Sequence, residues 1–263
     1  MYFLSFETST KIFSLALNKD AKVLRFRNIK SAMVLEDAII PAIDKMLDAA
    51  GISFDQVDGF AIALGPGSFT SLRVGLSTIK AFAMSTNKPV VGIPSMDIIA
   101  RGVCHSRASG NPLKEFIQYD QICVLNDARQ GKVYACLYGP QGATSEYLLT
   151  TLDDVLDKVH GNTIFVGDAL GIYRKDIEKA YQKHSLKKGN ACKCLFADEK
   201  WWYPQSKVMA QLVYERFQAK KFDDAAKLLP LYLYPQDCQV TPPVAGSSPN
   251  VSVGDLKKIH HGC

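Results

Sequence analysis

The chain has 263 residues, of which 47% are hydrophobic and 22% charged, and its formal net charge is +5. This composition excludes wholesale disorder, and the length allows one large domain or two modest ones. No stretch approaches the roughly 18 to 20 consecutive apolar residues of a membrane helix, and the first residues lack the basic start of a secretory signal. We therefore expect a cytoplasmic protein without a membrane segment. The mild positive charge permits contact with nucleic acid but does not establish it.

The first hundred residues predict alternating strands and helices. Apolar runs at 3–6 and 12–17 flank a turn-prone cluster and predict a β-hairpin. A helix should start near Ser31 and stop at Gly51, since apolar side chains recur at helical period: Leu35, Ile39, Ala42, Ile43, Met46 and Leu47. Pro41 should kink this helix or mark its first turn. A strand at 60–64, a helix from the following loop to Met84, a strand at 90–93 and a short helix from Ser95 to Ala100 complete this half.

The second half repeats the plan. Strands are expected at 122–126, 133–138, 164–166 and 194–197, and a helix at 207–217. Glu7 and Asp127 each end the first strand of a hairpin, which indicates a faint internal duplication, although two unrelated hairpins would look the same. We expect a first lobe at 1–102 with 205–222 packing back on it, and a second at 103–204. Residues 104–112 should be an exposed loop or insertion, and 236–263 a flexible tail.

The loop from Gly65 to Thr70 is the segment most typical of a binding site. Its two glycines allow a sharp turn between strand and helix, and Ser68 or Thr70 can cap that helix so that exposed amides hold an anion. Hairpin-end carboxylates could hold magnesium beside a nucleotide phosphate. The candidate nucleotide-proximal residues are Glu7, Thr8, Ser9, Gly65, Gly67, Ser68 and Asp127. The competing interpretations are a plain strand-to-helix turn and solvated turn carboxylates.

The helix that follows this loop has the pattern of an interface. Leu72, Leu76, Ile79 and Ala83 form an apolar stripe, while Ser71 and Gly75 are small enough for another helix to approach. Arg73 and Lys80 form a basic stripe. A glycine inside a helix costs about 1 kcal/mol relative to alanine, so a packing reason is expected, and packing within the chain is equally consistent.

Catalytic and metal-binding patterns are not evident. The five histidines form no spaced pair on a predicted helix, the seven cysteines are scattered apart from Cys192 and Cys194, and no G-x-S-x-G elbow occurs. We therefore predict no catalytic residues and no metal site.

Three motifs resemble those of the TsaB (YeaZ) family. Residues 65–75 resemble its G-P-G-S-F-T-G-L-R-I-G signature, residues 7–10 its D-T-S-T turn, and residues 127–134 its D-A-R-x-G-E-V-Y segment. A shorter match, P-x-Y-L, lies at 230–233. Two departures stand out, because Glu7 replaces an aspartate and Ser71 a glycine.

The resemblance implies a two-lobed α/β fold of the actin-like, Hsp70-like ATPase (ASKHA) class, with a mixed sheet and flanking helices in each lobe. It also implies a non-catalytic subunit that dimerises with, and supports, a TsaD-type catalytic subunit in threonylcarbamoyl transfer to tRNA adenosine beside the anticodon. A TsaE-type ATPase joins the assembly, a homodimer is an alternative, and tRNA is met through the complex. ATP and metal are expected on the partners, with no cofactor on this chain.

By position, the resemblance implies partner contacts through the first two helices. The residues expected at this interface are Leu35, Ile39, Ile43, Ser71, Leu72, Arg73, Gly75, Leu76 and Ile79. The alternatives are an active ATP- or metal-dependent transferase or kinase of the same fold, and a peptidase-like protein.

Overall fold

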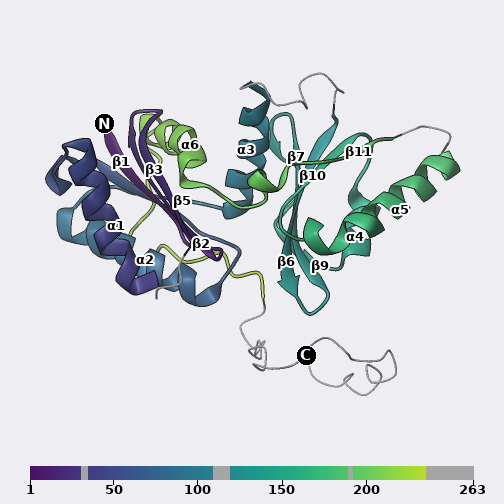
Figure 1. The fold of residues 1–263 in the computed structure, drawn as a ribbon, viewed down its shortest axis with the longest axis horizontal. Coiled ribbons are helices and arrows are strands. Elements are labelled where there is room, and N and C mark those ends of the chain that lie inside the picture. Colours follow the sequence, from purple (N-terminus) through teal and green to yellow (C-terminus); the bar gives the residue numbers. More distant parts are fainter. Residues whose placement is uncertain (31–34, 109–118, 189–191, 235–263) are drawn as a thin grey trace, which may run out of the picture.

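The computed structural model describes residues 1–30, 35–108, 119–188 and 192–234. They form two lobes side by side, each built on one mixed sheet (Figure 1). The sheet of the N-terminal lobe has the order β3-β2-β1-β4-β5. Its strands are β1 (Tyr2–Glu7), β2 (Ile12–Lys19), β3 (Lys22–Lys30), β4 (Gly59–Ala63) and β5 (Val90–Ile93).

Helices cover both faces of this first sheet, which explains why β1 is buried from Phe3 to Glu7. Successive side chains of a strand point to opposite faces. Leu4 and Phe6 pack with helices α1 (Leu35–Ala50) and α2 (Phe69–Thr86), whereas Phe3 packs with α6 (Ser206–Gln218) on the other face. A short 3₁₀ turn, η1 (Phe54–Gln56), precedes β4.

The C-terminal lobe repeats this plan with the strand order β11-β10-β6-β7-β8, and β9 also pairs with β7. The strands are β6 (Gln121–Arg129), β7 (Lys132–Gly139), β8 (Gly142–Ala143), β9 (Leu148–Thr150), β10 (Thr163–Val166) and β11 (Cys194–Phe196). Helix α3 (Ser95–Ala108) and the turn η3 (Glu199–Trp201) cover one face, while α4 (Leu152–Lys158) and α5 (Leu170–Lys188) cover the other. The second lobe is therefore also a sheet between helical layers.

The predicted two-lobed α/β class is confirmed, with two corrections of detail. Helix α3 continues to Ala108 instead of ending at Ala100, so residues 104–108 are helical and not an exposed loop. The apolar face of α3, which includes Met96, Ile99 and Val103, packs on the second sheet, and this contact supports the longer helix. The expected helix start near Ser31, residues 109–112 and the expected tail at 236–263 lie outside the described residues. Among the described residues, no helix is both long and apolar enough to span a membrane.

Candidate functional site

The Gly65 loop is folded against the turn between β1 and β2. Gly65 N–H donates to Ser95 Oγ (3.2 Å), and Ser95 N–H donates back to Gly65 O (2.8 Å). Ser68 N–H donates to Ser9 O (2.7 Å). A Cβ atom added to Gly67 would lie 2.1 Å from the same Ser9 oxygen, so only glycine allows this approach. Two amides of the loop, Gly65 N–H and Ser68 N–H, therefore bind other parts of this chain, whereas the first turn of α2 receives no side-chain capping hydrogen bond.

Glu7 is fully buried beneath this loop. Ser9 N–H donates to Glu7 Oε1 (2.5 Å), and Ser95 Oγ lies 3.2 Å from Glu7 Oε2. Burial raises the pKa of Glu7 to about 7, although the hydrogen bonds from Ser9 and Ser95 oppose that rise. The Glu7 carboxyl group therefore holds Ser9 and Ser95, and Ser95 in turn holds the Gly65 loop. Together with the bonded amides of Gly65 and Ser68, this arrangement leaves these groups of the loop a poor fit for a nucleotide phosphate or its magnesium ion.

Ser68 and Gly75, the predicted helix cap and the small residue of α2, both lie close to this turn. Ser68 occupies the N-cap position of α2 but makes no capping hydrogen bond, because its hydroxyl pairs with the Ser71 hydroxyl (2.9 Å). Thr8 is buried, and its Oγ1 has no hydrogen-bond partner in the described parts of the chain. A Cβ atom on Gly75 would lie 2.3 Å from that oxygen. Gly75 is therefore small to admit Thr8, not to admit a second helix.

Asp127 lies in the other lobe, where it makes hydrogen bonds at the turn between β6 and β7. Asp127 N–H donates to Asp168 Oδ1 (2.9 Å), and Asp127 Oδ1 accepts from Arg129 N–H (2.8 Å). Arg129 has a φ of 64°, and the acceptor helps to hold this left-handed turn. No described contact joins Asp127 to Glu7, so the structure does not bring the two hairpin-end acids into one site. Within the described ranges, no three potential metal ligands gather together.

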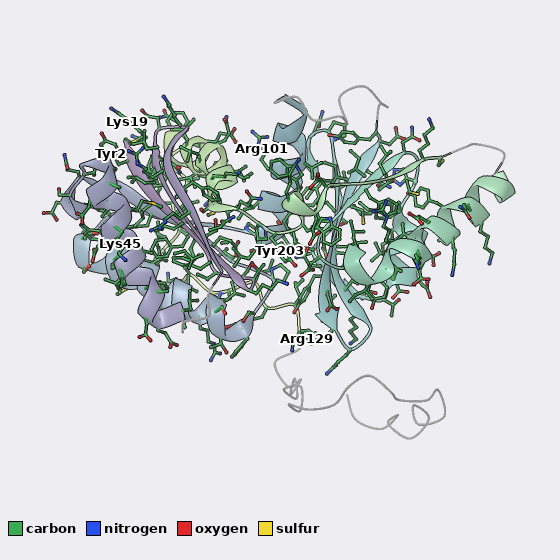
Figure 2. All side chains as sticks on the ribbon, viewed as in Figure 1. Tyr2, Lys19, Lys45, Arg101, Arg129 and Tyr203 are labelled. Carbon is green, nitrogen blue, oxygen red and sulfur yellow. The ribbon has the colours of Figure 1, made fainter. Side chains whose placement is uncertain are left out.

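The lobes approach each other near Lys11, at the end of the first hairpin. Lys11 Nζ lies 5.4 Å from the centre of the Tyr203 ring, and Tyr203 lies between the lobes in Figure 2. Burial raises the pKa of Asp168, and the nearby Asp127 charge adds to the rise; the Asp127 N–H and the charge of Lys11 oppose it. Lys11 thus places a positive charge from the first lobe near Asp168 of the second.

Most residues expected at a partner interface belong to the core of the N-terminal lobe. Five of them are at most 6% exposed: Ile39, Ile43, Leu72, Leu76 and Ile79. These side chains pack inside the lobe, because the apolar stripes of α1 and α2 cover the first sheet, and their contact with a partner stays a prediction. Leu35 and Ser71 are half-buried and Arg73 is exposed.

The basic stripe of α2 is occupied by the chain itself. Arg73 Nε donates to the Tyr232 hydroxyl (3.0 Å), and its guanidinium carbon lies 3.8 Å from the centre of the Phe69 ring. Lys80 Nζ donates to the carbonyl oxygens of Ala226 (2.9 Å) and Leu228 (3.2 Å). We call residues 223–234 the C-terminal strap. Arg73 and Lys80 thus contact the strap of their own chain, and Arg73 remains exposed.

The exposed apolar side chains of the two helices were not foreseen. Ile40 on α1 is 45% exposed, and Phe69 and Met84 on α2 are 52% and 62% exposed. Ile40 directly follows Ile39, and at 100° per residue two adjacent apolar residues cannot both occupy the centre of one apolar face. This adjacency was the available signal for an outward-facing residue.

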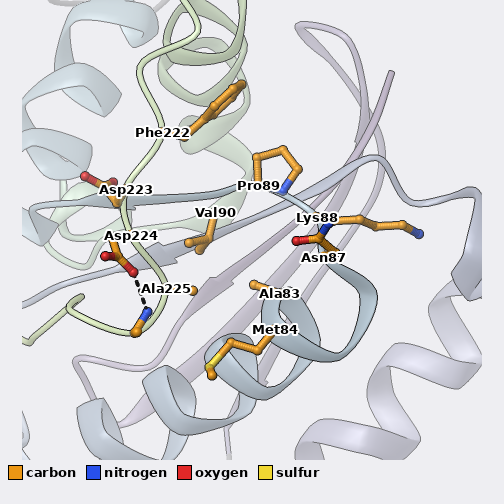
Figure 3. Close-up of a pocket in the computed structure, with 11 residues that line it drawn as sticks. Ala83, Met84, Asn87, Lys88, Pro89, Val90, Phe222, Asp223, Asp224 and Ala225 are labelled. Carbon is orange, nitrogen blue, oxygen red and sulfur yellow. Dashed lines mark hydrogen bonds between the residues drawn. The ribbon is translucent and has the colours of Figure 1, made fainter.

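An open pocket of about 510 Å³ lies where α2 ends, between Ala83, Met84 and the segment from Phe222 to Ala226 (Figure 3). Its charged groups already have partners within the chain. Asp223 Oδ2 accepts from Gly92 N–H (2.7 Å) and Arg216 (3.1 Å), and Lys88 Nζ donates to Asp55 O (2.8 Å). The pocket therefore lies between the strap and the N-terminal lobe, and the charged side chains Asp223 and Lys88 that line it are bonded within the chain.

Two lobes of matching plan, each a mixed sheet between helices, make a two-lobed α/β fold. The structure of YeaZ from Pseudomonas aeruginosa shares this fold, with a TM-score of 0.68 at 20% identity, covering 88% of this chain and 99% of that one. The chain belongs to the family described as "TsaD: tRNA N6-adenosine threonylcarbamoyltransferase", whose model matches residues 32–250.

Two curated relatives carry the description "tRNA threonylcarbamoyladenosine biosynthesis protein TsaB". The Haemophilus influenzae protein is 29% identical over 131 residues, or 50% of this chain and 51% of that protein. The Escherichia coli protein is 26% identical over 138 residues, or 52% of this chain and 55% of that protein. The chain spans about half the length of these relatives. The resemblance to the TsaB (YeaZ) family is confirmed.

Proposed function

We propose that this chain is a non-catalytic subunit that binds a TsaD-type catalytic subunit and supports threonylcarbamoyl transfer to tRNA adenosine beside the anticodon. The names of its TsaB relatives support the pathway. The geometry of the Gly65 loop carries the non-catalytic part of the proposal. Glu7 accepts hydrogen bonds from Ser9 and Ser95, and the Gly65 and Ser68 amides are bonded within the chain, so these groups are not free to hold a phosphate.

The remaining partners follow from the same proposal. ATP and metal reside on the other subunits, with a TsaE-type ATPase joining the assembly and tRNA reached through the complex. The complex works in the cytoplasm, and a homodimer is the resting alternative to the heterodimer. The partly or fully exposed residues of α1 and α2 that are available to a partner include Leu35, Ile40, Phe69, Ser71, Arg73 and Met84.

Activity measurements on the purified full chain test the non-catalytic role. Alone, the chain is expected to show neither ATP turnover nor threonylcarbamoyl transfer. Transfer by the TsaD-type and TsaE-type subunits should rise at least tenfold when the chain is added. Robust turnover by the chain alone would favour the alternative of an active transferase or kinase, and peptide cleavage would favour a peptidase.

Replacing Ile40 by aspartate tests whether α1 contacts the partner. Residues that cost more than about 1 kcal/mol on truncation are a minority of an interface and cluster at its well-packed centre, and a buried unpaired carboxylate adds a desolvation cost. We expect Ile40→Asp to weaken binding of the TsaD-type subunit at least tenfold in sedimentation or calorimetry. Ile172→Asp is the matched control, since Ile172 is 59% exposed on α5 of the other lobe. Equal affinities for the native chain and Ile40→Asp would remove α1 from the interface.

A further inference from the structure

The C-terminal strap is bound to the N-terminal lobe from Asp223 to Tyr232. It starts at the edge of the first sheet, where Asp223 N–H donates to Val90 O (2.9 Å). Lys80 then holds the carbonyl oxygens of Ala226 and Leu228, and Leu231 N–H donates to Leu64 O (2.7 Å) at the end of β4. Arg73 holds the Tyr232 hydroxyl. These contacts fix the path of a segment that has no helix or strand of its own.

The end of the strap reaches the other lobe. The Tyr234 hydroxyl donates to Ala128 O (2.7 Å) at the end of β6. The Tyr234 ring meets the Tyr134 ring of β7 edge-on, with 6.1 Å between the ring centres, and Lys132 Nζ lies 6.0 Å from the Tyr234 ring. In Figure 1 the yellow-green strap leaves the first lobe and runs toward the lower part of the second. The same twelve-residue stretch, 223–234, is thus bonded to both lobes.

We propose that the C-terminal strap is a latch that holds the two lobes at one fixed angle. Two-lobed proteins commonly close around ligands by rotation of one lobe against the other. Such a rotation would pull Tyr234 from Ala128, or Leu231 and Tyr232 from the first lobe. A fixed angle suits a subunit that presents a rigid surface, so this inference deepens the scaffold function proposed above and rests on it.

Tyr234→Phe tests the latch, because it removes the hydrogen bond to Ala128 and keeps the ring against Tyr134. Spin labels attached through a ketone-bearing amino acid at positions 45 on α1 and 175 on α5, both exposed, report the distance between the lobes. The full native chain should give one narrow distance distribution. Loss of one hydrogen bond of ordinary strength should raise the population of open lobes about five- to tenfold and add a second distance. Amide exchange at Leu231 should accelerate by a similar factor.

A second variant, Arg73→Met with Lys80→Met, releases the strap from the first lobe and should also broaden the distribution. Tyr214→Phe is the control, because the Tyr214 hydroxyl makes no hydrogen bond within the described part of the chain, and its distribution should stay narrow. Broadening in either strap variant, with the control unchanged, supports the latch. Unchanged distances in both strap variants, or equal broadening in the control, would overturn it. Because the labelled chain is measured without a partner, the latch and the partner-binding function can fail separately.

Discussion

Gly75→Ala is expected to lower the free energy of unfolding by about 2 kcal/mol, although alanine is the better helix former. The added Cβ atom would lie 2.3 Å from Thr8 Oγ1 and 2.7 Å from Thr8 Cγ2. Thr8 is only 1% exposed and is held in the turn above Glu7, so its side chain has little room to yield. Urea unfolding of the two proteins, followed by circular dichroism, measures the difference.

Gly171→Ala provides the matched control for this substitution. Gly171 also lies in a helix, but its added Cβ atom would meet only a Trp202 ring carbon at 3.7 Å, which is an ordinary contact. This variant should be as stable as the native chain, or more stable by up to about 1 kcal/mol.

A double substitution locates the cause. Thr8→Ala removes the two nearest atoms and leaves Thr8 Cβ at 3.0 Å, so Gly75→Ala should cost less in the Thr8→Ala background than alone. Equal costs in both backgrounds would contradict the contact. Gly75 faces Thr8 of its own chain, so a larger side chain at this position tests the folding of the lobe.

The stability of the native chain is expected to fall as the pH rises from about 5 to 8, because of Glu7. Its ordinary pKa of 4.5 applies to the unfolded chain, and burial raises the folded value to about 7. Between these values the unfolded chain loses the proton while the folded chain keeps it, so folding becomes progressively less favourable. Below pH 4.5 both states are protonated and the cost is absent. Above pH 7 it is complete, at about 3 kcal/mol.

Glu7→Gln isolates this effect from the other titrating groups. Glutamine has the shape of the protonated carboxyl group, and its oxygen can still accept from Ser9 N–H. We expect the variant to match the native chain near pH 4.5 and to exceed its free energy of unfolding by about 3 kcal/mol at pH 8. Urea unfolding at both pH values measures the two differences. A difference that is the same at pH 4.5 and pH 8 would show that Glu7 does not titrate between them.

The sequence alone predicted most of the secondary structure and the fold class. Local patterns were sufficient for this, because strand alternation, helical period and the glycine turn at 65–67 act over a few neighbouring residues. The resemblance of residues 65–75 to a family signature supplied the two-lobed architecture and the pathway. The end of α3 was misjudged because most residues after Ala100 are polar, and the packing of the helix on the second sheet, which includes Val103, outweighs that local signal.

The candidate site could be predicted only in part. The sequence grouped Glu7, Ser9, Gly65, Gly67 and Ser68, and the structure places the turn and the loop that contain them against each other, while their contact with a nucleotide stays a prediction. Ser95, which completes the cluster, lies 88 residues beyond Glu7 and is brought there by the path of β5 to α3. No local pattern reveals that a buried serine closes the loop, so the sequence left open the phosphate site that the tertiary contacts disfavour.

What the sequence determined by itself is which residues of α1 and α2 are apolar, small or basic, and at what spacing they recur. The tertiary structure decided what each stripe faces. Ile39, Ile43, Leu72, Leu76 and Ile79 face the sheet, Gly75 faces Thr8, and Arg73 and Lys80 face a strap that begins more than 140 residues later. The physical reason is that periodicity reports the direction of a side chain around its own helix axis. Whether core, strap or another protein lies in that direction depends on contacts between residues far apart in the chain.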